Sequence, residues 1–158
     1  MKKTSVIFIS STGGHLSEML ELKDMFKKYD YHIITEKTKS NTSLIKKHPN
    51  RVDFLLYGNK HNLLLYPCVV IANSIKTLIY YLKYRPKYII TTGAHTAAPM
   101  CLIGNFFGSK IVFIETFANV ESKTMTGKYV YRFADKFIVQ WPNMKKLYPK
   151  AEYNGWIY

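Results

Sequence analysis

One stretch of the sequence decides the fold: Val6-Ile7-Phe8-Ile9-Ser10-Ser11-Thr12-Gly13-Gly14-His15. Its first four residues form an apolar run typical of a buried strand, and small residues and two glycines follow before a helical pattern begins. Such a strand, turn and helix place free backbone N–H groups at the carboxyl edge of a sheet, where the helix dipole adds positive potential. The turn therefore predicts a site for a phosphate or another anion. His15 at its mouth is a candidate base.

A second turn of the same kind, Thr91-Thr92-Gly93-Ala94-His95, follows the apolar run Tyr88-Ile89-Ile90. Neither turn is a full GxGxxG or P-loop pattern, so each motif alone is only moderately specific. The polar segment 36–41 follows another strand-like run and predicts a mobile, solvated loop at the same edge of the sheet.

Strand-like and helical patterns alternate along the chain. Strands are expected at 5–9, 31–35, 52–56, 88–92, 110–114 and 136–139, and helices at 16–28, roughly 63–83, 97–107 and 123–133. This alternation predicts an α/β fold: a Rossmann-like parallel sheet with helices on both faces. We expect a single domain over 1–158, with residues 150–158 as a carboxyl-terminal tail. Ligands of such sheets bind at the carboxyl ends of the strands, where both histidine turns should lie.

The charge of the chain indicates an anionic partner. The 158 residues carry a net charge of +13, which favours a phosphorylated substrate, a membrane surface or nucleic acid. No arginine-rich helix or RNA-binding aromatic pattern is present, so nucleic acid ranks last. Cys68 and Cys101 both lie in apolar runs and are expected to be buried, reduced thiols, with no metal site. The apolar run of the first strand is too short for a signal peptide, and 10–14 does not resemble a cleavage region, so we expect a cytoplasmic protein.

The stretch 61–85 allows two interpretations. Its unbroken apolar run, 63–72, has ten residues, fewer than the roughly 18–20 that span a bilayer. It is either a helix that covers the sheet, or a partly exposed helix that lies in the membrane interface between flanking lysines and Arg85. Pro67 indicates a helix start or a kink nearby.

Several groups of residues recur in the order of a known family. They are Thr12-Gly13-Gly14-His15, Thr92-Gly93-Ala94-His95 with Pro99, Ile114-Glu115-Thr116-Phe117-Ala118, and the run from Phe133 to Pro142 that leads to Tyr148-Pro149-Lys150-Ala151. Over essentially its whole length the chain resembles the PssD/CpsF-type enhancer subunit of split bacterial polysaccharide glycosyltransferases. That subunit is a relative of the membrane-anchoring subunit of the eukaryotic dolichol-linked GlcNAc transferase. More distantly, the chain is similar to the amino-terminal half of MurG-type GT-B enzymes.

The resemblance implies a half GT-B fold that holds the acceptor, while a separate partner chain binds the nucleotide sugar. It implies an inverting transfer, guessed as β-1,4-galactosyl transfer from a UDP-sugar to a polyprenyl-diphosphate-linked sugar, in capsular or exopolysaccharide biosynthesis. No cofactor is implied, and no DxD triplet indicates a metal. The eukaryotic relative has an amino-terminal membrane span that this chain lacks, so we expect peripheral contact with the cytoplasmic membrane face. The alternatives are a non-catalytic membrane adaptor that recruits its partner, and a self-sufficient sugar-nucleotide-binding enzyme.

Candidate site residues follow from the motifs and the resemblance. His15 matches the histidine of the MurG-type glycine loop and is either the base or a group that orders the turn. Glu115 ends a buried strand and is a second catalytic candidate, or else a capping or pairing carboxylate. The predicted acceptor and diphosphate ligands are Thr12, Gly13, Gly14, Gly93 and His95.

The carboxyl-terminal residues are unusually aromatic. Trp141, Trp156 and Tyr158 are the candidate partner contacts, because large aromatic side chains are favoured at interfaces. The alternative is that the tail packs on its own domain.

Overall fold

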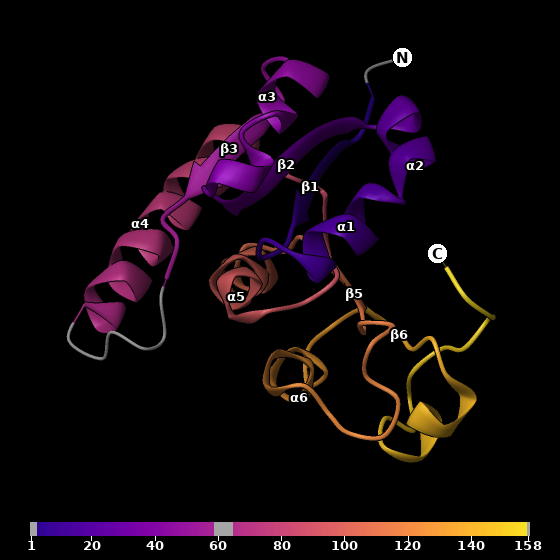
Figure 1. Cartoon of the computed structure of the whole chain (residues 1–158). Helices are drawn as coiled ribbons and strands as arrows, with labels where there is room; N and C mark the ends of the chain where they lie inside the picture. Colours follow the sequence, from indigo (N-terminus) through magenta and orange to yellow (C-terminus); the bar gives the residue numbers. More distant parts are fainter. Residues whose placement is uncertain (1–2, 59–64, 158) are drawn as a thin grey trace.

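A computed structural model describes residues 3–58 and 65–157 of the chain. In the described residues, six strands form one sheet in the order β3-β2-β1-β4-β5-β6, and every neighbouring pair is parallel. Figure 1 shows β3 and β6 at opposite sides of the molecule. The strands are β1 (Ser5–Ile9), β2 (Asp30–Glu36), β3 (Val52–Leu55), β4 (Tyr88–Thr91), β5 (Lys110–Ile114) and β6 (Lys136–Ile138). This is the strand order of dinucleotide-binding α/β folds, so the predicted Rossmann-like fold class is confirmed.

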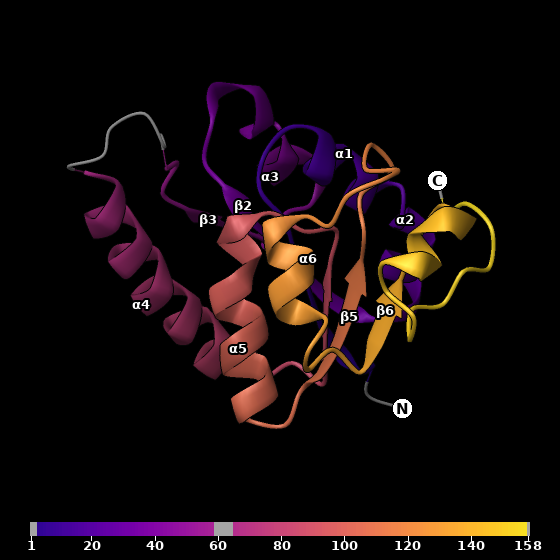
Figure 2. The same ribbon diagram turned by 90° about the horizontal axis from the view of Figure 1, so that it is seen from below.

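Helices cover both faces of the sheet (Figure 2). One face carries α1 (Gly14–Leu20), α2 (Lys23–Lys28) and α3 (Leu44–Lys47), and the other carries α4 (Tyr66–Tyr84), α5 (Ala98–Phe106) and α6 (Met125–Val130). Short 3₁₀ turns complete the described elements: η1 (Lys39–Asn41), η2 (His95–Ala97) and η3 (Pro142–Lys146). Within the described parts of the chain, no helix has the length and apolar content needed to cross a membrane.

The core has two halves that alternate along each central strand. In β1, Ile7 and Ile9 face the layer of α5 and α6, whereas Val6 and Phe8 face the layer of α1 and α2. Burial on both sides explains why β1 is an unbroken apolar run in the sequence. On the α5 side, Gly104 lets the helix lie directly on the strands, because a Cβ there would be 2.1 Å from a side-chain carbon of Ile89.

The single helix predicted over 16–28 is wrong, because two short helices occupy that stretch. The amides of Glu21 and Leu22 bond to the carbonyls of Glu18 and Met19, three residues back, and this tightening ends α1 before α2 begins. Since α1 has only seven residues, its dipole is shorter than the sequence pattern predicted. The start of α4 agrees with prediction, with Pro67 in its first turn.

The two cysteines differ in environment. Cys101 is buried, as predicted, and burial raises the pKa of its thiol to about 12. Cys68 is exposed, so the prediction of two buried thiols is wrong for this residue. Cys68 lies in an apolar run because the side of α4 that faces away from the core is itself apolar.

Candidate acceptor site at the carboxyl edge of the sheet

The two histidine turns meet at the centre of the sheet. The strands that precede them, β1 and β4, are direct neighbours. After β1 the chain crosses one face toward β2, and after β4 it crosses the other face toward β5. Such a switch in the direction of the crossovers opens a crevice at the carboxyl ends of the strands, which is where these folds bind ligands.

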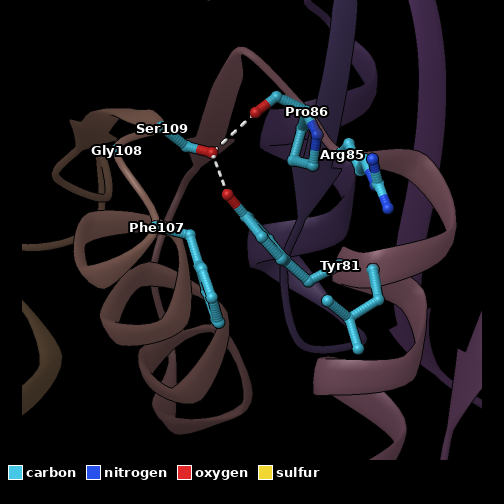
Figure 3. A pocket seen from close by; sticks show the side chains of 7 residues that line it. Tyr81, Arg85, Pro86, Phe107, Gly108 and Ser109 are labelled. Carbon is cyan, nitrogen blue, oxygen red and sulfur yellow. Dashed lines mark hydrogen bonds between the residues drawn. The ribbon is translucent and has the colours of Figure 1, made fainter.

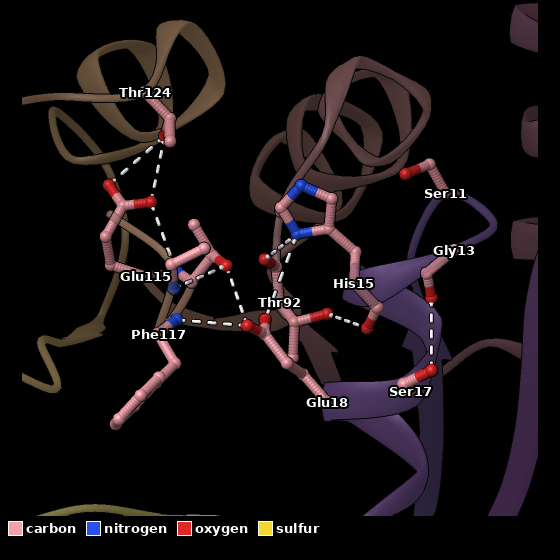
Figure 4. A network of polar contacts seen from close by, with 12 residues as sticks. Ser11, Gly13, His15, Ser17, Glu18, Thr92, Glu115, Phe117 and Thr124 are labelled. Carbon is pink, nitrogen blue, oxygen red and sulfur yellow. Dashed lines mark hydrogen bonds and ion pairs between the residues drawn. The ribbon is translucent and has the colours of Figure 1, made fainter. Parts of the chain in front are cut away.

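His15 joins the two turns through its ring and its backbone. Its Nδ1 lies 2.9 Å from the carbonyl oxygen of Thr92, and the Thr92 hydroxyl donates to the His15 carbonyl at 2.7 Å (Figure 4). A carbonyl only accepts hydrogen bonds, so Nδ1 carries the hydrogen and the neutral ring has its lone pair on Nε2. Among the described residues no hydrogen bond engages Nε2. The ring is therefore fixed in the tautomer that a general base requires.

The backbone of the second turn makes room for this ring. Gly93 has a φ of +106°, and a Cβ there would lie 3.5 Å from Cε1 of His15 and 3.4 Å from the ring of Phe113. Gly13, at the start of α1, also has a positive φ, of +82°. Both glycines thus meet the predicted need for a tight turn. Gly14 does not, because its φ is ordinary and nothing lies within 4 Å of a Cβ built there.

Glu18 links the same site to the loop after β5, and the sequence analysis missed it. Its Oε1 accepts hydrogen bonds from the Thr116 hydroxyl at 2.7 Å and the Phe117 amide at 3.0 Å. Its Oε2 is buried, has no hydrogen-bond partner among the described residues, and lies 3.9 Å from Nδ1 of His15. The spacing of three residues between His15 and Glu18, which places both on one helix face, was the available signal.

Glu115 lies at the end of β5, and its carboxylate turns toward α6 (Figure 4). It accepts hydrogen bonds from the hydroxyls of Tyr148 at 2.8 Å and Thr124 at 3.0 Å, and from the Thr116 amide at 3.2 Å. Burial raises the pKa of Glu115, although these hydrogen bonds act against the shift. A structural role accounts for each of these contacts, and the catalytic role of Glu115 stays a prediction.

His95 lies beside a buried carboxylate that the sequence analysis placed in a solvated loop. Glu36, 2% exposed, accepts a hydrogen bond from the Thr96 hydroxyl at 2.7 Å, and its Oε1 is 3.5 Å from Nε2 of His95. Asn41, 4% exposed, donates to the Glu36 carbonyl at 2.6 Å. The prediction of a solvated loop is wrong for these two residues, because Glu36 bonds to η2 and Asn41 bonds to the backbone of Glu36. The His95 ring also approaches Tyr66 of α4, with 5.9 Å between ring centroids.

Thr12 lies at the rim of a cavity of about 350 Å³ between α1 and the segment that contains η1 and α3. Its hydroxyl is 3.3 Å from that of Thr38. The polar lining is made of hydroxyl, amide and ammonium groups from Thr12, Ser17, Ser40, Asn41, Ser43 and Lys47. Hydroxyls and a cation are suited to a sugar or a phosphate. The described residues contain no group of three His, Cys, Asp or Glu side chains placed to hold a metal ion.

An aromatic cluster lies next to the site. The rings of Phe117, Trp141 and Trp156 pack with centroids 4.8–5.6 Å apart, and Nε1 of Trp141 donates to the Phe117 carbonyl at 2.8 Å. The tail thus packs on its own domain, yet Trp156 remains 61% exposed. Tyr158, the third predicted partner contact, lies outside the described residues.

Comparison with known proteins identifies relatives of the chain. Residues 60–157 match the family described as "Oligosaccharide biosynthesis protein Alg14 like". A protein named UDP-N-acetylglucosamine transferase subunit alg14, from Schizosaccharomyces pombe, is 41% identical over 44% of this chain and 36% of its own length. Its counterpart from Candida glabrata is 28% identical over 94% of this chain and 75% of its own length. The chain thus matches little more than a third of the length of the fission-yeast protein.

A solved structure supports the fold. The crystal structure of MurG from Acinetobacter baumannii superposes with a TM-score of 0.70 and 17% identity, over 89% of this chain and 42% of that one. The expected likeness to about half of a MurG-type chain is therefore confirmed for the fold. The expected relation to the eukaryotic GlcNAc transferase subunit is confirmed by sequence, whereas the assignment to the bacterial PssD/CpsF type stays a prediction.

Proposed function

The chain belongs to the Alg14-like family of oligosaccharide biosynthesis proteins, and from this we propose that it is the acceptor-side subunit of a two-chain glycosyltransferase. The observation that carries the proposal is the candidate site at the carboxyl edge, where the turns of His15 and His95 follow the neighbouring strands β1 and β4. In this proposal a second chain supplies the donor site, since the curated relatives are named as subunits of a transferase.

In this proposal the crevice holds a lipid-linked sugar. The polar cavity beside Thr12 and the turns of Gly13 and Gly93 receive its diphosphate, and His95 contacts the acceptor. Nε2 of His15 takes the proton from the acceptor hydroxyl while the hydroxyl oxygen attacks the anomeric carbon of the donor sugar. The bond from that carbon to the nucleoside diphosphate breaks, and the diphosphate leaves on the partner chain with the bonding electron pair.

The donor is proposed to be a UDP-sugar. N-acetylglucosamine is the first sugar to test, since the curated relatives are named for it. Galactose in β-1,4 linkage, expected from the bacterial resemblance, is the second, together with a role in capsular or exopolysaccharide synthesis. The same assay distinguishes the two sugars.

A non-catalytic adaptor is the alternative function. It is favoured by the fact that His15, Glu18 and Glu115 all hold neighbouring segments together through hydrogen bonds. In that case the site would order the surface that the partner binds, and the partner would supply every catalytic group.

The proposal is tested by sugar transfer from labelled UDP-sugars to a polyprenyl-diphosphate-linked sugar. The chain is assayed alone, with the donor-binding subunit from the same cells, and as a His15→Ala variant in that pair. We expect transfer only by the pair, and its loss in the variant while the complex stays intact. Full transfer by the chain alone would refute the two-chain enzyme, and undiminished transfer by the variant pair would favour the adaptor.

A further inference from the structure

Helix α4 buries polar side chains and exposes apolar ones, the reverse of the usual pattern for a helix on a sheet. The side chains that it buries against the domain are polar or carry a hydroxyl: Asn73, Thr77 and Tyr81. Its exposed side is an apolar stripe at helical spacing, made of Val70, Ile71, Ile75, Leu78, Ile79 and Leu82. A helix that merely covers a sheet turns its apolar side inward, so this stripe requires another explanation.

Hydrogen bonds to the edge of the sheet fix this orientation. The Asn73 side chain bonds to both the amide and the carbonyl of Leu56, at 2.8 and 2.9 Å. The Tyr80 hydroxyl donates to the Phe54 carbonyl at 3.1 Å. Rotating α4 to bury its apolar stripe would break these bonds and leave buried polar groups unpaired, which is costly. The outward stripe is therefore a stable feature of the fold.

The apolar surface continues onto the end of α5, which packs beside α4 (Figure 2). Phe106 is 82% exposed, and the exposed Phe107 stacks on Tyr81 with ring centroids 5.3 Å apart. Leu82 and Phe107 also line a hollow of about 430 Å³ with Arg85 at its side (Figure 3). We call the α4 stripe, the α5 end and this hollow the α4–α5 face.

The charged side chains on the helices of this face are all basic, and the carboxylate of Asp53 on β3 pairs with one of them, Lys83, at 4.0 Å. The sequence contains no Asp or Glu between Asp53 and Glu115, a segment that includes all of α4 and α5 and six lysine and arginine residues. On α4 itself, Lys76 and Lys83 lie over the rings of Tyr80 and Tyr84. The guanidinium of Arg85 forms no ion pair with any residue that the structure describes.

We infer that the α4–α5 face docks on an anionic lipid leaflet, with α4 lying flat on it and Arg85 receiving a lipid headgroup at the hollow. An apolar stripe without acidic residues and with a basic flank has the charge pattern that anionic lipids attract. The inference rests on the proposed function and adds a route for the acceptor. The first turn of α4 brings Tyr66 beside His95, so a lipid-linked sugar in the same leaflet would reach the carboxyl edge from the α4 side.

The test is cosedimentation of the full chain with vesicles of phosphatidylcholine, with and without phosphatidylglycerol. Ile75→Glu removes one residue of the stripe, and Ile45→Glu on α3 is its matched control, because the two isoleucines are 56% and 50% exposed. We expect Ile75→Glu to bind vesicles about tenfold more weakly or worse, because an isoleucine side chain that would be buried in the lipid is lost. Ile45→Glu should bind like the wild type. Arg85→Gln should lose about fivefold on anionic vesicles only, whereas Arg132→Gln should not.

The inference is overturned if the wild type does not bind anionic vesicles, or if Ile75→Glu and Ile45→Glu bind equally. It is also overturned if Ile75→Glu turns an oligomer into a monomer without changing vesicle binding, because the face would then join copies of the chain. Sugar transfer to a short-chain, water-soluble acceptor separates this inference from the proposed function. In the pair, Ile75→Glu should keep transfer to the soluble acceptor and lose transfer to an acceptor embedded in vesicles. A wild-type pair that binds vesicles but transfers sugar to neither acceptor would refute only the proposed function.

Discussion

The imidazole of His15 has two tasks that a single substitution can separate. Nδ1 ties α1 to the turn after β4 through the Thr92 carbonyl, and Nε2 is available for proton transfer. An alanine removes both functions at once, so its effect would not distinguish a base from a structural histidine. The side-chain amide of asparagine offers a donor at nearly the position of Nδ1 and nothing at the position of Nε2.

We predict that His15→Asn keeps the fold and the complex but lowers kcat by roughly 10²–10⁴, the usual contribution of a general base. The measurement is steady-state transfer by the purified pair, with complex formation and thermal unfolding as controls. Near-normal kcat in His15→Asn, alongside a folding defect in His15→Ala, would show that only the bond to Thr92 matters.

Glu115 lies at the expected edge of the sheet, but hydrogen bonds already engage its carboxylate. Its position at the end of β5 is the one predicted, but its carboxylate bonds to Thr124, which caps α6, and to Tyr148. The sequence does not reveal this, because the chain returns to the site only 33 residues later, at Tyr148.

Burial raises the pKa of Glu115 in the folded chain above its unfolded value, so its protonated form favours folding. Its contribution is greatest below the unfolded pKa of about 4.3 and is lost as the pH rises through the folded pKa. Glu115→Gln does not titrate, and we therefore predict that the stability of the wild type relative to this variant falls with rising pH. Urea unfolding of both proteins across that range measures it, and a relative stability independent of pH would contradict it.

At the scale of elements, the sequence pattern predicted the positions of the strands well and those of the helices less well. The six strands are found within one or two residues of their expected positions, because apolar runs bounded by turn residues are a local signal. The break between α1 and α2 and the burial of Glu36 were not predicted. The burial of Glu36 depends on a distant segment, through the bond from Thr96 to Glu36 across 60 residues. The break between the helices comes from local hydrogen bonds of three-residue span, which the apolar pattern does not reveal.

The packing of α6 against the Glu115 side chain depends on Gly127. A Cβ at Gly127 would lie 2.5 Å from Oε2 of Glu115 and from the Tyr148 hydroxyl. We predict that Gly127→Ala destabilises the chain by about 1–3 kcal/mol, the usual cost of overpacking. Gly14→Ala is the control, because nothing lies within 4 Å of its new Cβ. Urea unfolding compares the two, and equal stabilities would mean that the Glu115 network moves aside without cost.

At the scale of the whole molecule, the sequence predicted the architecture, and it placed the candidate site at the carboxyl edge of the sheet. It left open whether the apolar stretch 61–85 covers the sheet or lies at a membrane. Composition alone cannot decide this, because the same apolar residues suit either environment. In the structure α4 packs on the sheet, and the bonds of Asn73 and Tyr80 to the edge of the sheet turn its apolar side outward. Residues 59–64, which precede this helix in the sequence, lie outside the described residues.

The central question about this chain is which substrate it holds. The direct test is equilibrium binding of two ligands to the chain alone: a short-chain prenyl-diphosphate sugar as the acceptor, and a UDP-sugar as the donor. We predict that the acceptor binds and the donor does not, and that Gly93→Ala, which forces a side chain into a positive φ beside His15, abolishes acceptor binding. Binding of the UDP-sugar without the acceptor would contradict the acceptor-side assignment.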